Sequence, residues 1–143
     1  MQEFTLLLIK PNATRKHRIG AILAKVEESG FEIEAMRLLT MDGELAAQFY
    51  AMHHGKPFYD RLVEFMTSGR TVAVALRRDY AISHLRTLVG ATNPGQAAPG
   101  TIRHMYGQSV TQNAVHASDS PENANREIAL MFPQLAGTLQ NTL

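Results

Sequence analysis

Cysteine is absent from the 143 residues of the chain. The absence excludes disulfide bonds, thiolate nucleophiles and metal sites built on cysteine. It also fits the reducing cytoplasm, which is the compartment that we predict. The chemistry of the protein must therefore depend on other side chains.

The chain also lacks an excess of charge of one sign and any long hydrophobic run. Fourteen Lys and Arg nearly balance 13 Asp and Glu, so nothing draws the whole chain toward nucleic acid or a membrane. No apolar stretch approaches the ~20 residues that cross a bilayer. The apolar run at residues 4–9 follows an acidic residue and has no basic segment before it, so we predict a strand rather than a signal peptide. We expect neither a membrane nor a specific nucleic acid as a partner.

Several motifs of nucleotide-dependent and hydrolytic enzymes are missing. The sequence contains no GxxxxGK[ST] loop, no GxGxxG fingerprint and no GxSxG motif. His53 and His54 are adjacent, so they lack the i, i+4 spacing of a helical zinc pair. We therefore expect no metal ion held by protein side chains.

Apolar periodicity predicts that strands alternate with helices. The strands are expected at residues 4–9, 31–38, 71–76 and 115–116, the second with a bulge where its apolar phase changes. The helices are expected at residues 19–26, 45–52, 62–66, 82–89 and 121–132. Their expected caps are Gly30, Asp79 and the pair Ser120-Pro121. Residues 90–112 are rich in Gly, Pro and Asn and predict a long loop.

This order of elements is close to a doubled split βαβ pattern. We predict an α+β fold of the ferredoxin-like sandwich type, with a four-stranded antiparallel sheet and helices packed on one face. The length fits a single domain over residues 1–143.

The segment NAVHASDS at residues 113–120 raises the question of what its histidine does. An imidazole that acts as a nucleophile needs a neutral nitrogen, room for the incoming group and a partner for the other nitrogen. The small residues Ala114 and Ala117 leave room near His116. Glu127 lies at the edge of the buried stripe of the last predicted helix, where it could accept a hydrogen bond from His116 or Ser118.

A structural explanation of the same residues stays open at this point. A histidine at a strand end is more often a packed core residue than a nucleophile. Ser-Asp-Ser before a helix is mostly a capping sequence, and Glu127 could extend to solvent.

Four motifs together resemble the nucleoside diphosphate kinase family. They are KPNA at residues 10–13, GATNP at 90–94, APGTIR at 98–103 and NAVHASDS at 113–120. The resemblance covers essentially the whole chain. It implies a ferredoxin-like core and a phosphotransferase that moves the terminal phosphate of a nucleoside triphosphate, typically ATP, reversibly to a nucleoside diphosphate. It also implies a phosphohistidine intermediate in a ping-pong cycle that maintains the NTP and dNTP pools.

The resemblance assigns catalytic roles by position. His116 matches the nucleophile, and Glu127 and Ser118 match the residues that orient it. Lys10 matches the lysine beside the transferred phosphate and the sugar hydroxyl, and Tyr50 matches the tyrosine that lines the histidine.

The resemblance likewise implies which residues bind the nucleotide. Arg86, Thr92 and Arg103 match the groups that hold the phosphates, and Asn113 matches the residue that contacts the sugar. The implied cofactor is Mg²⁺ carried by the nucleotide, with no protein side chain as its ligand. Fixed cations and this ion suit phosphoryl transfer, because charge spreads over the transferred oxygens.

The base is expected to lie between Phe58 and Val110 by the same resemblance. Stacking recognises a face that every base has, so selection among bases should be weak. One site used twice is then enough for a ping-pong cycle.

The sequence departs from the family pattern at several positions. Ala117 stands where many relatives have glycine, and it would cost about 1 kcal/mol if that position needed a positive φ. Asn12 replaces a common aspartate, and Met52 stands where an acid is common. Arg77-Arg78 replace a Glu-Gly pair, and we expect these changes to alter the charge near the nucleotide end.

Two other functions and the oligomeric state are open at this stage. The chain could be a nucleotide-binding module that lost turnover, or an RNA-binding ferredoxin-like domain. The RNA reading lacks a basic-aromatic motif and a broad basic surface. The resemblance implies a homo-oligomer, either a tetramer or a hexamer, without deciding between them.

Overall fold

The computed structural model describes residues 2–143 and contains four strands and seven α-helices within that range. The strands are β1 (Gln2–Ile9), β2 (Glu32–Thr40), β3 (Arg70–Asp79) and β4 (Val115–Ala117). The α-helices are α1 (Pro11–Arg15), α2 (Ile19–Glu28), α3 (Gly43–Phe49), α4 (Tyr59–Met66), α5 (Ala81–Val89), α6 (Ile102–Tyr106) and α7 (Pro121–Met131). Three 3₁₀ helices are η1 (Ala51–His53), η2 (Pro94–Gln96) and η3 (Pro133–Leu135).

The strands form one antiparallel sheet in the order β2-β3-β1-β4. Strand β1 pairs with β3 along its whole length, but with β4 only from Leu7 to Ile9. The short strand β4 therefore lies beside the carboxyl end of β1. The four-stranded antiparallel sheet predicted from the sequence is confirmed, and the register shift between Ile33 and Ala35 confirms the bulge in β2.

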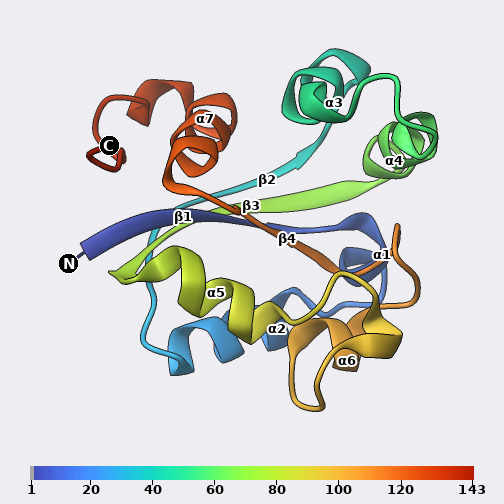
Figure 1. Cartoon of the computed structure of the whole chain (residues 1–143), viewed down its shortest axis with the longest axis horizontal. Helices are drawn as coiled ribbons and strands as arrows, with labels where there is room; N and C mark the ends of the chain where they lie inside the picture. Colours follow the sequence, from blue (N-terminus) through green and yellow to red (C-terminus); the bar gives the residue numbers. More distant parts are fainter. Residues whose placement is uncertain (1) are drawn as a thin grey trace.

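Helices cover both faces of the sheet, so the prediction of helices on one face was wrong (Figure 1). Leu7 and Ile9 pack in a core with α2 and α5, whereas Leu6 and Leu8 pack in a second core with α3, α4 and α7. Successive residues of a strand point to opposite faces. The uninterrupted run Leu6 to Ile9, fully buried at every position, therefore requires two covered faces.

Most helix boundaries follow the predicted capping signals, with one error. Ser120 accepts a hydrogen bond from the Asn123 amide at 3.1 Å, and Gly30, the cap predicted for α2, has a left-handed φ of 90°. Asp79 does not cap α5, because it lies in β3 and its carboxylate pairs with Arg78. The cap comes from β1, where Glu3 Oε1 accepts the Ile82 amide at 2.8 Å.

The predicted long loop is partly ordered as helix. Residues 90–112 contain η2 and α6, and Thr101 caps α6 by accepting the His104 amide at 3.3 Å. Helix α1, which follows β1 directly, was missed because its five residues are too few for a periodic pattern. Among residues 2–143, no helix is long and apolar enough to cross a bilayer.

Candidate active site

A cleft of about 520 Å³ opens where the carboxyl end of β1 meets β4. It brings together residues that are up to 117 positions apart in the sequence, from Lys10 to Glu127. Of the residues predicted from the sequence, all except Ser118 line it: Lys10, Tyr50, Phe58, Arg86, Thr92, Arg103, Val110, Asn113, His116 and Glu127. Ser118 lies directly behind the wall, fully buried.

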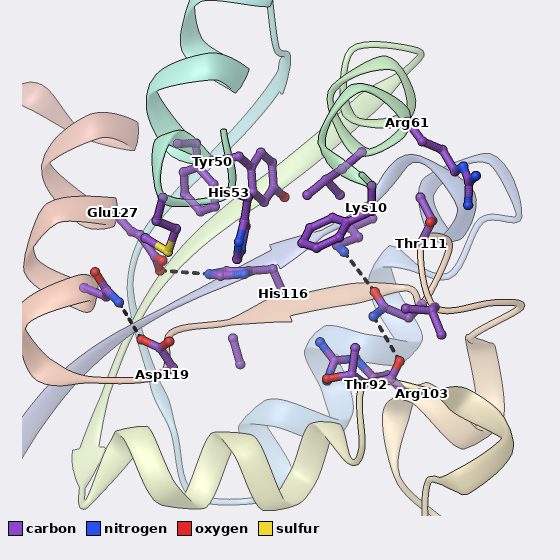
Figure 2. A pocket seen from close by; sticks show the side chains of 18 of the residues that line it. Lys10, Tyr50, His53, Arg61, Thr92, Arg103, Thr111, His116, Asp119 and Glu127 are labelled. Carbon is purple, nitrogen blue, oxygen red and sulfur yellow. Dashed lines mark hydrogen bonds and ion pairs between the residues drawn. The ribbon is translucent and has the colours of Figure 1, made fainter. Parts of the chain in front are cut away.

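His116 in β4 is held by a carboxylate from α7 (Figure 2). Its Nε2 lies 2.8 Å from Glu127 Oε1, and the same oxygen accepts the Ser118 hydroxyl at 2.7 Å. Ser118 Oγ in turn accepts the Leu6 amide of β1 at 3.1 Å. With Glu127 occupying Nε2, Nδ1 is the imidazole nitrogen left for a ligand.

Two aromatic side chains from the end of α3 complete the wall around this histidine. The ring of Phe49 meets the His116 ring edge-on, with 5.0 Å between centroids. Tyr50 is buried, and its hydroxyl has no hydrogen-bond partner among residues 2–143. Burial raises the pKa of Tyr50, and the nearby charge of Glu127 raises it further. The phenol therefore stays protonated and can donate to a ligand.

Lys10 ends β1 and is buried in the floor of the cleft. Its Nζ donates to Asn113 Oδ1 at 2.9 Å, and Asn113 Nδ2 donates to the Thr92 carbonyl at 3.1 Å. Burial lowers the pKa of Lys10 to about 7, with a smaller contribution from the charge of Arg103. No carboxylate among residues 2–143 forms an ion pair with this amine, so an anionic ligand would supply its counter-charge.

Arg86 and Arg103 add two cations to the same cleft. Arg103 donates to the carbonyls of Gly90 and Val115 at 2.9 and 3.0 Å, which fixes its guanidinium, while its Nε has no partner among the described residues. Burial, then the charge of Arg86, lowers the pKa of Arg103 to about 10. Three basic side chains that pair with no carboxylate among residues 2–143 form an anion-binding surface.

A tight turn connects Asn113 to the strand that carries His116. The Val115 amide donates to the Asn113 carbonyl at 3.0 Å, and Ala114 between them has a φ of 74°, which is the geometry of a γ-turn. Ala114 is fully buried, and its carbonyl accepts the Lys10 amide at 2.8 Å. The backbone therefore stores strain in the segment that holds three of the site residues in place.

Two apolar side chains line the mouth of the cleft. Phe58 and Val110 line it from opposite segments and are 41% and 56% exposed. Exposed apolar side chains on two sides of an opening suit a flat ring between them.

Comparisons with known proteins agree on one family. The family model described as nucleoside diphosphate kinase matches residues 3–136. The chain is 49% identical to the nucleoside diphosphate kinase of Persephonella marina over 133 residues, which cover 93% of this chain and 95% of the relative.

This chain belongs to the nucleoside diphosphate kinase family.

Solved structures of nucleoside diphosphate kinases have the same fold. The enzyme of Aquifex aeolicus superposes with a TM-score of 0.91 at 41% identity, covering 92% of this chain and 96% of that chain. The enzyme of Halobacterium salinarum in complex with CDP superposes with a TM-score of 0.89 at 39% identity, covering 92% and 88%. The predicted fold and the predicted phosphotransferase class are thereby confirmed. Nucleoside diphosphate kinases transfer the terminal phosphate between nucleoside triphosphates and diphosphates.

The structure adds cleft residues that the sequence reasoning missed. Met52, His53, Arg61, Thr111 and Asp119 also line the cleft. His53 and Asp119 carried a signal, since each lies three positions after a predicted site residue, but the first was considered only as a zinc ligand and the second only as part of a cap.

The departures from the family pattern have different consequences. Ala117 lies in β4 and is not among the non-glycine residues with positive φ, so it carries no strain of the kind considered above. Asn12 Nδ2 donates to the Gln112 carbonyl at 3.1 Å, a bond that an aspartate could not donate. Met52 does line the cleft.

The expectation that Arg77 and Arg78 change the charge near the nucleotide was wrong. Arg77 pairs with Phe4 in the register of the sheet, toward the amino end of β1 and away from the cleft. It forms ion pairs across the strand with Glu32 and Glu34. Arg78 donates to the Ser29 carbonyl at 2.6 Å.

Within residues 2–143, no three His, Asp or Glu side chains cluster as a metal site. Of the two carboxylates that line the cleft, Glu127 is engaged by His116 and Ser118. Asp119 accepts a hydrogen bond from Asn123 Nδ2 at 2.7 Å, and this bond is the main cause of its lowered pKa. One ionised carboxylate fits a hydrated Mg²⁺ carried by phosphates better than an ion bound by the protein.

Proposed function

We propose that the protein transfers the terminal phosphate through a phosphohistidine on His116. Nδ1 of His116 forms a bond to the terminal phosphorus of a nucleoside triphosphate, and the bond from that phosphorus to the bridging oxygen breaks. The nucleoside diphosphate leaves with the electron pair of that bond. A second nucleoside diphosphate then attacks the phosphorus with its terminal oxygen, which regenerates the histidine.

The observation that carries this proposal is the contact between His116 Nε2 and Glu127 Oε1 in the wall of a cationic cleft. A carboxylate at Nε2 favours the tautomer with the proton on that nitrogen and leaves the lone pair of Nδ1 free to attack. It also stabilises the positive charge that the ring gains when Nδ1 is phosphorylated.

The phosphates are held by basic side chains that are already in place. Lys10, Arg86 and Arg103 line the cleft, and none of them pairs with a carboxylate among residues 2–143. The two arginines are charged before binding, and Lys10 becomes charged as the phosphates arrive, so charge developing on the transferred oxygens meets positioned donors. The free hydroxyl of Tyr50 is a further donor next to the histidine. Thr92 and Arg103 would hold the inner phosphates.

The residues that line the same cleft also suggest where the sugar and the base would lie. Asn113, which bonds Lys10, would contact the sugar hydroxyl, and the base would stack between Phe58 and Val110 at the mouth. The relative from Halobacterium salinarum was solved with CDP, which supports a nucleotide in this fold.

Mg²⁺ is the proposed cofactor, bound by the nucleotide phosphates with Asp119 as the side chain available to its water shell. When bound, the ion neutralises phosphate charge. The protein contributes the fixed cations and the dry wall around His116.

The assembly and location of the protein are also proposals. We propose one domain over residues 1–143 that forms a homo-oligomer, as a tetramer or a hexamer, in the cytoplasm. The family resemblance and the absence of cysteine support this proposal.

Steady-state kinetics test the proposed cycle. Initial rates are measured with ATP as donor and GDP as acceptor, each varied at several fixed concentrations of the other. A ping-pong cycle on one histidine gives parallel double-reciprocal lines. Intersecting lines would contradict the covalent intermediate, and nucleotide binding without turnover would leave a binding module.

A further inference from the structure

Arg61 lies at the mouth of the cleft and was not part of the family motifs. It belongs to α4 and lies three residues after Phe58, so the two side chains project from the same side of the first turn. Arg61 is exposed and lines the cleft together with Val110 and Thr111. Figure 2 shows Arg61 and Thr111 at the same end of the cleft.

The cleft continues past these residues into a second cavity. Arg61, Val110 and Thr111 line both the cleft and this cavity of about 570 Å³, which α4 and residues 109–112 enclose. A base between Phe58 and Val110 has its sugar toward Lys10 and Asn113, so the six-membered ring of a purine, with its C6 substituent, points toward Arg61 and Thr111.

The guanidinium of Arg61 has no ionic partner in the described part of the chain. The ion pairs of residues 2–143 involve Arg77, Arg78 and Arg126, together with His116. Arg15, the other arginine of the second cavity, is already engaged, because it donates to the Ser68 carbonyl and hydroxyl at 2.8 and 2.7 Å. Of the two arginines that line the second cavity, Arg61 is therefore the one whose guanidinium is free to contact a ligand.

Arginine offers only donors, so it distinguishes bases by the group on the exposed edge. At C6 guanine carries the acceptor O6 beside a second acceptor, N7, whereas adenine carries an amino donor beside N7. A guanidinium can bond both guanine acceptors at once but must face the amino donor of adenine.

We propose that Arg61 is a specificity-determining residue that favours guanine over adenine in the acceptor nucleotide. The proposal rests on the base position of the proposed function. It adds selection to a stacking site that would otherwise treat all bases alike.

The test compares GDP, IDP and ADP as acceptors for the phosphorylated protein and, in parallel, as ligands of the unphosphorylated protein by calorimetry. Replacing Arg61 by Ala should lower the GDP-to-ADP ratio of kcat/KM and of affinity by about fivefold, the lower end for an arginine–guanine contact because Arg61 is exposed. Arg61→Glu, which offers acceptors, should lower the ratio further. IDP keeps O6 and N7 without the 2-amino group, so it should behave like GDP.

Two controls separate this effect from general charge. Arg70→Ala removes an exposed arginine at the start of β3, outside both cavities, and should leave the ratio unchanged. A general loss of positive charge would weaken GDP and ADP equally. Equal weakening in Arg61→Ala, or IDP grouping with ADP, would overturn the proposal. The calorimetric ratio still decides the role of Arg61 if His116 never becomes phosphorylated, because binding does not require transfer.

Discussion

Glu127 Oε1 lies 2.8 Å from His116 Nε2 and accepts the Ser118 hydroxyl at 2.7 Å. The oxygen of one buried carboxylate thus links the imidazole of β4 to a hydroxyl that is itself anchored on β1. This arrangement fixes the ring before any nucleotide binds.

Glu127→Gln should lower kcat on the order of a hundredfold, because an amide can present its NH₂ group to Nε2 and favour the wrong tautomer. The measurement is kcat with ATP and GDP at saturation. Glu122→Gln, an exposed acid in the first turn of the same helix, is the matched control and should keep full activity. A kcat for Glu127→Gln within twofold of the parent would contradict the orienting role.

Lys10 should take up a proton when a nucleotide binds. Its pKa of about 7 leaves it mostly neutral near pH 8, and nearby phosphates favour the charged form. Calorimetry at pH 8 in buffers of different ionisation enthalpy should give an uptake approaching one proton per site. The uptake should vanish in Lys10→Gln and persist in Lys16→Gln, an exposed neighbour. Equal uptake in parent and Lys10→Gln would refute the assignment.

The same group should make stability depend on pH. In the unfolded chain the pKa of Lys10 returns to its ordinary value of 10.5. Between about pH 7 and pH 10.5 the unfolded chain therefore binds more protons than the folded chain, and the contribution of Lys10 to the free energy of unfolding rises with pH. Urea unfolding at pH 7 and pH 9 should show this rise relative to Lys10→Met. A parallel pH dependence of the two proteins would count against the buried amine.

Tyr50→Phe should separate catalysis from stability. The Tyr50 hydroxyl is buried without a partner, so its removal should raise the free energy of unfolding by about 1 kcal/mol. It should also lower kcat by about tenfold or more, because a donor to the transferred phosphate is lost. Tyr59→Phe, the same change outside the cleft, should lack the loss of activity. Full activity in Tyr50→Phe would show that this hydroxyl does not contact the reacting group.

Asn141 fastens the carboxyl end of the chain to β1. Its side chain accepts the Phe4 amide at 2.7 Å and donates to the Phe4 carbonyl at 2.9 Å. Asn141→Ala leaves both backbone groups unpaired and should lower the free energy of unfolding by about 2 kcal/mol with kcat unchanged. Thr142→Ala, at an exposed neighbour, is the control. Urea unfolding with a difference below about 0.5 kcal/mol would mean that water replaces Asn141.

The parts of the fold that were predicted correctly depend on local chemistry. Ser120 and Pro121 start α7 as expected, because a cap and its first turn lie within four residues. The cap of α5 could not be predicted, since its acceptor is Glu3, 79 residues from Ile82 and brought there by the sheet. The left-handed Ala114 was equally hidden, because alanine gives no sequence signal for a γ-turn.

In the candidate site, too, the sequence predicts contacts between residues that are close in the chain and misses contacts between distant ones. His116, Glu127 and Ser118 lie within 12 residues, so helix and strand periodicity alone indicated their proximity. Lys10 and Asn113 are 103 residues apart and bonded at 2.9 Å, a contact that no local pattern contains and that only the family resemblance implied. Arg61 belongs to no motif, and its place at the mouth became visible only with α4 in position.

The central claim is that His116 carries the phosphate, and the most direct test is to trap it there. The protein is mixed with Mg²⁺ and ATP labelled on the terminal phosphate, isolated, and then given unlabelled GDP. The account predicts label on the protein that is stable to base and labile to acid, lost to GDP within the dead time of manual mixing, and absent in His116→Ala. A protein that binds nucleotide but never takes the label on His116, or a His116→Ala variant that is labelled equally, would contradict it.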